Sequence, residues 1–233
     1  MTWLFDNFHY VWSLTLRHMW LSAVPVVVGF VVALPIGWYA SRHKWLGGGL
    51  LSLSSILYTI PSLPLFVILP GLLGTGFLSA VNVIVALSIY AVAIMVRSSS
   101  DAFGSVSPAV LDAASAAGFS PAQRAFRVEL PLAGPVLLAG LRVVSVSTVS
   151  LVSVATIIGV SNLGSLFTDG LRRSFNTEVV IGVVATVIIA LFFDLVLVIA
   201  GKLLLPWTSA GRPQRIRNPL TPMAEFGLRG GGA

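Results

Sequence analysis

The chain has 233 residues, of which 56% are hydrophobic and only 9% are charged, and its net charge is +6. A soluble domain carries roughly 25% charged residues because it needs a polar surface, so this composition excludes a soluble protein and indicates one solvated by lipid. The absence of cysteine excludes disulfides and thiolate metal sites, and the three histidines are scattered without metal-ligand spacing, which disfavours a metalloenzyme.

Five stretches are apolar enough to cross a membrane, because a helix needs about 20 apolar residues to span a bilayer core. We predict spans at residues 20–41, 48–69, 78–97, 132–159 and 178–204. The second and third spans share one uncharged run, which we divide near residues 70–76. The first span should be retained rather than cleaved as a signal peptide, because its basic residues Arg42 and Lys44 follow the apolar stretch.

The two ends of the chain differ from the spans. Residues 3–19 mix aromatic and charged side chains, which fits either an amphipathic helix in the membrane interface or an extension of the first span. The C-terminal end is rich in Pro, Gly and Arg and has no periodicity, which is typical of disorder. We therefore divide the chain into an interfacial helix (1–19), a transmembrane domain (20–205) and a disordered cytoplasmic tail (206–233).

The basic residues indicate an orientation. If the N-terminus is outside, three basic residues outside the spans face outward, Arg17, Arg172 and Arg173. Ten face the cytoplasm: Arg42, Lys44, Arg97, Arg124, Arg127, Lys202, Arg212, Arg215, Arg217 and Arg229. Cytoplasmic segments of membrane proteins are enriched in Lys and Arg, so the N-terminus is predicted outside and the C-terminus inside.

The cytoplasmic segment between the third and fourth spans, residues 98–131, is too long for a simple turn. A Ser-Pro pair at 107–108 is typical of a helix start, and Gly118 of a helix end. A second Ser-Pro pair at 120–121 starts another short helix, which Pro131 should end before the next span. The pattern predicts an Ala-rich helix–turn–helix whose small residues suit docking into a groove on another protein.

This segment resembles the cytoplasmic loop of ABC-importer permeases, which reads Glu-Ala-Ala, three residues, Gly, nine residues, then Ile-x-Leu-Pro. The residues in register are Asp112, Ala113, Ala114, Gly118, Val128, Leu130 and Pro131, with Asp for Glu and Val for Ile. In that family the loop is the coupling helix that docks on a cytoplasmic ATPase. The resemblance implies this coupling role for the matching residues, and we add Arg124 from the second short helix.

Other stretches resemble the osmoprotectant permeases of that family, which serve glycine betaine, carnitine, choline and related compounds. Matching stretches are Tyr58 to Phe66, Gly74 to Gly76, and Asp194 in the last span. The chain departs from the subgroup at residues 97–99, which read Arg-Ser-Ser in place of Arg-Asn-Thr. It departs again at residues 159–164, which read Gly-Val-Ser-Asn-Leu-Gly in place of Gly-Ala-Gly-Gly-Leu-Gly.

The resemblance implies an all-α membrane protein of the type I ABC-importer kind, in the bacterial inner membrane, that forms half of a translocation pathway. The implied partners are a second permease copy or a paralogue, two ATPase subunits and an extracytoplasmic substrate-binding protein, with membrane lipid around the spans and no nucleic acid. The chain itself would need no cofactor and catalyse no reaction, because ATP and Mg would bind the ATPase.

Two further groups of residues are candidates for function. The prolines of the second span free backbone carbonyls, so the pathway lining could include Thr59, Pro61, Ser62 and Pro64, or these residues could simply kink a packed helix. Arg142 and Asp194 are charges inside the fourth and fifth spans. They are expected to pair, because a charge within a bilayer needs a partner, or else to act separately.

Three other functions remain open from the sequence. The first is an ABC-importer permease for another small polar solute such as an amino acid. The second is an intramembrane enzyme that uses Asp194 with Arg142, although no nucleophile–base pair has helical spacing. The third is a secondary transporter or channel that works without an ATPase; five spans are few for paired repeats within one chain.

Overall fold

The computed structural model describes residues 2–209, and in this range all regular elements are helices. The α-helices are α1 (Thr2–Asp6), α2 (Phe8–Arg42), α3 (Lys44–Thr59), α4 (Ser62–Leu73), α5 (Ala80–Gly104), α6 (Pro108–Ala116), α7 (Pro121–Arg124), α8 (Leu130–Val154), α9 (Gly164–Arg172) and α10 (Asn176–Leu204). A π-helical turn, η1 (Ala125–Glu129), joins α7 to α8, and 3₁₀ turns are η2 (Ala155–Ile158) and η3 (Pro206–Ser209). The first residues of the predicted disordered tail (206–233) form η3, and the rest of that tail lies outside the described residues.

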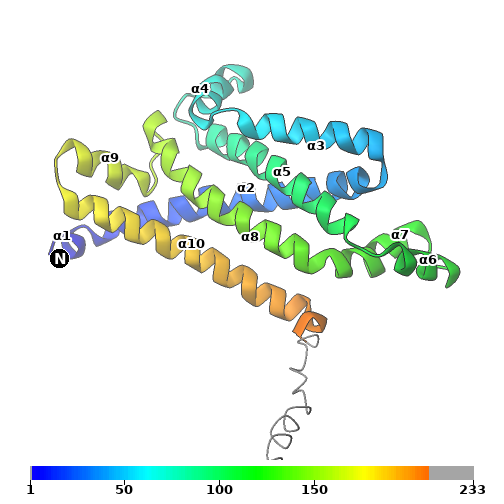
Figure 1. Ribbon diagram of the computed structural model, residues 1–233. Helices are drawn as coiled ribbons and strands as arrows, with labels where there is room; N and C mark the ends of the chain where they lie inside the picture. Colours follow the sequence, from blue (N-terminus) through cyan, green and yellow to red (C-terminus); the bar gives the residue numbers. More distant parts are fainter. Residues whose placement is uncertain (1, 210–233) are drawn as a thin grey trace, which may run out of the picture.

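The long helices confirm the all-α membrane fold. Within the described range, four helical stretches are long and apolar enough to cross a membrane: α2, α5, α10 and the continuous run from α7 through η2. The bent pair α3 and α4 is a fifth candidate. Figure 1 shows α2, α5, α8 and α10 side by side, with α6 and α7 at one end of the bundle and α1 and α9 at the other.

The second predicted span, 48–69, is not one straight helix. The axes of α3 and α4 meet at 100°, and the residues between them, Ile60 and Pro61, have extended backbones. Proline disfavours the helical conformation at the residue before it and offers no N–H to the preceding turn, which explains the break. The carbonyl of Ile60 is freed from the helix and accepts a hydrogen bond from the hydroxyl of Tyr90 in α5.

Residues 8–19 lie within α2 rather than in a separate interfacial helix over 1–19. No Gly or Pro interrupts this stretch, and its buried residues Val11, Leu14 and His18 continue the packed face of the first span. The ring of His18 bonds to the carbonyl of Val149 in α8, with Nε2 3.0 Å from the oxygen. The outer part of α2 is therefore fixed to the bundle.

The most extensive helix contact in the described range is between α2 and α5, and two glycines of α2 make it close. A Cβ at Gly29 would lie 3.0 Å from the carbonyl carbon of Ala91, and one at Gly37 would lie 2.9 Å from that of Ser99. Small residues let helix backbones approach closely in membranes. Since the two contacts are eight residues apart on each helix, α2 and α5 pack closely over two turns.

Candidate functional site

The predicted cytoplasmic helix–turn–helix is formed by α6 and α7. Pro108 is in the first turn of α6, and Ser107 is in the N-cap position although its hydroxyl makes no capping bond. The helix ends just before Gly118, whose φ of 83° is left-handed, while the amide of Phe119 bonds to the carbonyl of Ala114 at 3.1 Å. Glycine adopts this conformation without the strain that a side chain would add, so Gly118 sets the turn.

The second short helix starts as predicted but does not end as predicted. The hydroxyl of Ser120 accepts from the amide of Gln123 at 3.3 Å, and the side chain of Gln123 accepts from the amide of Ser120 at 3.0 Å, which is a capping box. A stop at Pro131 is wrong, because the chain continues through η1 into α8. The amide of Leu130 bonds to Ala125 in the wider π register, and Pro131 falls in the first turn of α8, where proline is tolerated.

The predicted coupling residues divide into exposed and inward-facing sets. Asp112, Ala113 and Gly118 are exposed at the end of the bundle, whereas Ala114 is buried. Four residues nearer α8 are half-buried: Arg124, Val128, Leu130 and Pro131. The surface open to another protein is therefore the outer side of α6 and its turn, and the residues nearer α8 anchor the loop to the bundle.

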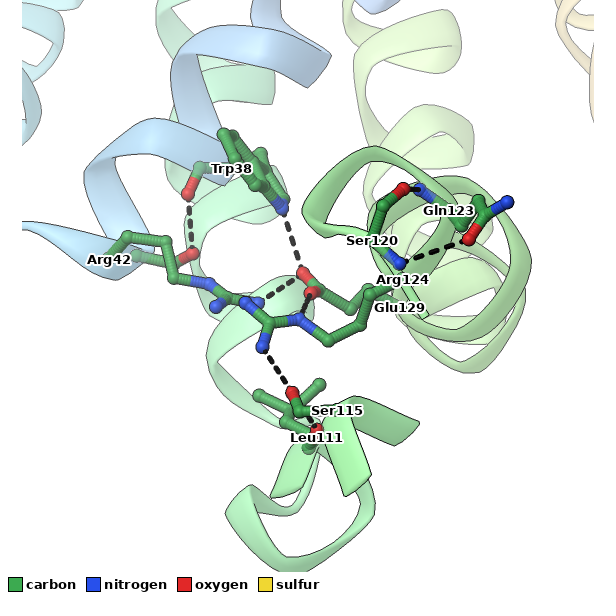
Figure 2. Close-up of polar contacts among 9 residues, drawn as sticks. Trp38, Arg42, Leu111, Ser115, Ser120, Gln123, Arg124 and Glu129 are labelled. Carbon is green, nitrogen blue, oxygen red and sulfur yellow. Dashed lines mark hydrogen bonds and ion pairs between the residues drawn. The ribbon is translucent and has the colours of Figure 1, made fainter. Parts of the chain in front are cut away.

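A buried carboxylate, Glu129, connects this loop to the end of α2 (Figure 2). Only 1% of the Glu129 side chain is exposed. Its Oε2 accepts a hydrogen bond from Nε1 of Trp38 at 2.8 Å and pairs with Arg42, and its Oε1 accepts from Nε of Arg124 at 3.1 Å. Nη1 of Arg124 also donates to the hydroxyl of Ser115 in α6 at 2.9 Å. Residues of α2, α6 and α7 are thus joined through one carboxylate.

Sequence reasoning missed this network, although a signal was present. Glu129 is an acidic residue between Val128 and the Leu-Pro pair at the entry to an apolar span. A carboxylate buried there needs donors, and two arginines, Arg42 and Arg124, were already expected on the same side of the membrane. The missing information was which of the basic residues on that side would be within reach.

The intramembrane charges form the predicted pair. Nε and Nη2 of Arg142 in α8 lie 2.6 Å and 2.8 Å from the two carboxylate oxygens of Asp194 in α10. This two-bond geometry matches the planar guanidinium to the carboxylate and neutralises both charges. The alternative, in which each charge acts separately, is not what the structure shows.

The candidate pathway residues lie together at the bend between α3 and α4. Thr59, Pro61 and Pro64 are exposed on this chain and Ser62 is half-buried. The hydroxyl of Thr59 donates to the carbonyl of Ile56 at 2.7 Å, within its own helix. Residues 2–209 contain no group of three or more His, Asp or Glu side chains that could hold a metal ion. The bend therefore offers short polar side chains rather than charges.

Comparisons with known proteins agree on one family. The sequence profile of binding-protein-dependent transport system inner membrane components matches residues 25–210. The osmoprotectant import permease protein OsmW of Salmonella typhimurium is 32% identical over 196 residues, covering 82% of this chain and 90% of that protein. The choline transport system permease protein OpuBB of Bacillus subtilis is 32% identical over 192 residues, covering 82% and 87%.

A solved structure shows the same fold. The inward-facing methionine ABC transporter MetNI contains a chain that superimposes with a TM-score of 0.69, covering 80% of this chain and 94% of that one. The sequence identity is 20%, so this likeness concerns the fold alone.

Proposed function

We propose that this chain, which belongs to the family of binding-protein-dependent transport system inner membrane components, is the membrane permease of an ATP-driven importer for osmoprotectants. The observation that carries the proposal is the small-residue surface of α6 and its Gly118 turn, exposed at one end of a type I ABC-importer permease fold. A smooth helical projection of this kind fits a groove on a partner protein.

The substrate class rests on the relatives. The proteins OsmW and OpuBB are named for osmoprotectant import and choline transport, and a further relative in Bacillus subtilis is named for glycine betaine, carnitine and choline. An amino-acid importer is the second candidate, since solved structures with this fold include a methionine transporter and an amino-acid transporter. Those structures are at most 22% identical, whereas the osmoprotectant relatives reach 32%, so we favour osmoprotectants.

The proposed assembly contains more than this chain. Two permeases, this chain with a second copy or a paralogue, would form the pathway, while a substrate-binding protein would deliver the solute from outside. The ATP and Mg would be held by two cytoplasmic ATPase subunits, so the permease would catalyse no reaction. An outside N-terminus is supported by basic residues in the last turns of α2 and α10, Arg42 and Lys202, at the same end of the bundle as α6 and α7.

Co-purification of the ATPase with permease variants tests the docking surface. Ala113→Asp adds a charge to the exposed face of α6 without changing the backbone, and Gly118→Asp also strains the left-handed turn. Both variants should enter the membrane but lose the ATPase. Gly104→Asp is the matched control, since Gly104 is exposed at the end of α5 with nothing within 4 Å of an added Cβ. Wild-type retention of the ATPase by Ala113→Asp would reject docking on α6.

The substrate class has its own test in proteoliposomes that contain the permease, the ATPase and the binding protein. Labelled choline, glycine betaine and carnitine should be taken up in an ATP-dependent manner, and labelled methionine should not. Uptake of the amino acid in place of the three osmoprotectants would favour the second candidate.

A further inference from the structure

We propose that Glu129 is a positioning residue that ties the inner end of α2 to the coupling helices, so that a movement imposed on α6 and α7 is passed to α2. The proposal deepens the proposed function and rests on it, because it assumes that an ATPase docks on α6. It assigns a role to a buried carboxylate that lies beside the docking surface but is not itself exposed to a partner.

The order of the helices explains why such a tie is needed. Only three residues separate α5 from α6, and η1 leads from α7 directly into α8. Movement of the coupling helices therefore reaches α5 and α8 through the chain itself. The inner end of α2 is followed by His43 and α3, so it has no covalent connection of this kind. Movement can reach α2 indirectly through its close packing on α5, and a direct connection to the coupling helices requires contact between side chains.

Glu129 supplies that contact from both sides. Trp38 and Arg42 reach it from α2, and Arg124 reaches it from α7 while also holding Ser115 of α6. Figure 2 shows Glu129 between these groups, with Arg42 and Arg124 directed toward its carboxylate. The carboxylate is the only acceptor that the two sides share in this network.

The connection through Glu129 resists sliding because the carboxylate is buried and its donors are held in place. A buried carboxylate loses its hydration and depends on all its donors, so sliding of α2 against the loop would leave charged groups unpaired. The guanidinium of Arg42 also lies over the ring of Trp38, 5.6 Å from its centroid, which restricts both side chains. We therefore expect α2 and the coupling helices to move together rather than past each other.

The helix α2 is suited to carry such a movement across the membrane. It is continuous over 35 residues, which corresponds to about 50 Å at 1.5 Å per residue. Gly29 and Gly37 hold it closely against α5. A displacement at Arg42 would thus be carried to the outer end of the bundle by two packed helices.

The test compares import with ATP hydrolysis in proteoliposomes that hold the permease, the ATPase and the binding protein. Glu129→Gln keeps the shape of the side chain but removes the charge that holds the two arginines. The expected result is retention of the ATPase, hydrolysis within twofold of wild type, and at least fivefold less solute imported per ATP. The control Asp101→Asn removes an exposed carboxylate, 3.7 Å from Arg97 on α5, and should leave this ratio unchanged.

Two outcomes would overturn the proposal. An unchanged import-to-hydrolysis ratio in Glu129→Gln would show that the tie transmits nothing, and loss of the ATPase would assign Glu129 to docking. If Glu129→Gln does not reach the membrane, the double variant Trp38→Phe/Arg42→Gln, which removes both contacts from the α2 side, is measured against the same two outcomes. Failure of the proposed function is distinguishable, because the wild-type permease would then bind no ATPase or import no osmoprotectant.

Discussion

Replacement of Gly37 by alanine should loosen the contact on which movement of α2 with α5 depends. The added Cβ would lie 2.8 Å from the amide nitrogen of Ser100 and 2.9 Å from the carbonyl carbon of Ser99. Ordinary contacts of a Cβ are 3.4–4 Å, and the Cβ of Ser99 would lie closer still, so the helices must separate by more than roughly half an ångström. Overpacking costs ~1–3 kcal/mol, toward the upper end here because backbone atoms cannot rotate away. The higher helix propensity of alanine offsets ~1 kcal/mol of this cost, so the free energy of unfolding should fall by ~1–2 kcal/mol.

The assay is thermal unfolding of the detergent-solubilised permease. Each kcal/mol corresponds to ~2–4 °C in a chain of this length, so Gly37→Ala should lower the midpoint by ~2–8 °C. Gly48→Ala is the matched control, because an added Cβ at Gly48 meets nothing within 4 Å and only the gain in helix propensity remains. It should raise the midpoint. Equal midpoints for Gly37→Ala and Gly48→Ala would contradict the close approach of α2 to α5.

Three other sets of variants test separate features. The double variant Pro61→Ala/Ser62→Ala should lower uptake while expression and ATPase binding stay normal, and normal uptake would reject a pathway role for the bend. Arg142→Asp and Asp194→Arg should each reduce the amount of inserted protein, and the double variant should restore it; a double variant as poor as either single one would argue against the pair. Ser120→Ala removes a capping bond worth ~1 kcal/mol, so amide exchange in α7 should accelerate roughly fivefold, which hydrogen-exchange mass spectrometry would detect or exclude.

The sequence predicts the spans and the coupling helices because both depend on local chemistry. Apolar length is enough to locate α2, α5, α8 and α10, since an apolar helix in lipid satisfies its own backbone hydrogen bonds. The turn at Gly118 and the helix start at Ser120 are predicted equally well, because each involves residues within a few positions of one another. The pair of Arg142 and Asp194 follows from depth alone, since one charge of each sign lies inside the spans.

Features that depend on competing local preferences are predicted less well. Pro61 and Pro131 look alike in the sequence, yet the chain bends by 100° after Ile60 and continues as a helix through Pro131. The difference lies in the preceding residues. A π turn precedes Pro131, with the amide of Leu130 bonded to the carbonyl of Ala125, whereas the chain breaks at Ile60, whose exposed carbonyl accepts a hydrogen bond from the hydroxyl of Tyr90.

Arg42 shows why the network at Glu129 could not be predicted from charge patterns. Counted along the sequence, Arg42 is one of several basic residues that indicate orientation, and this use requires no partner. In the structure it is bound to a carboxylate 87 residues away in the chain, together with Arg124 from the coupling loop. A basic residue that sets the orientation lies at the level of the lipid headgroups, which is also where the coupling helices meet the bundle. A basic residue placed there for orientation is therefore already in position to pair with an acidic residue of the loop. The burial of Glu129 between Arg42 and Arg124 uses that position to join α2 to the coupling helices.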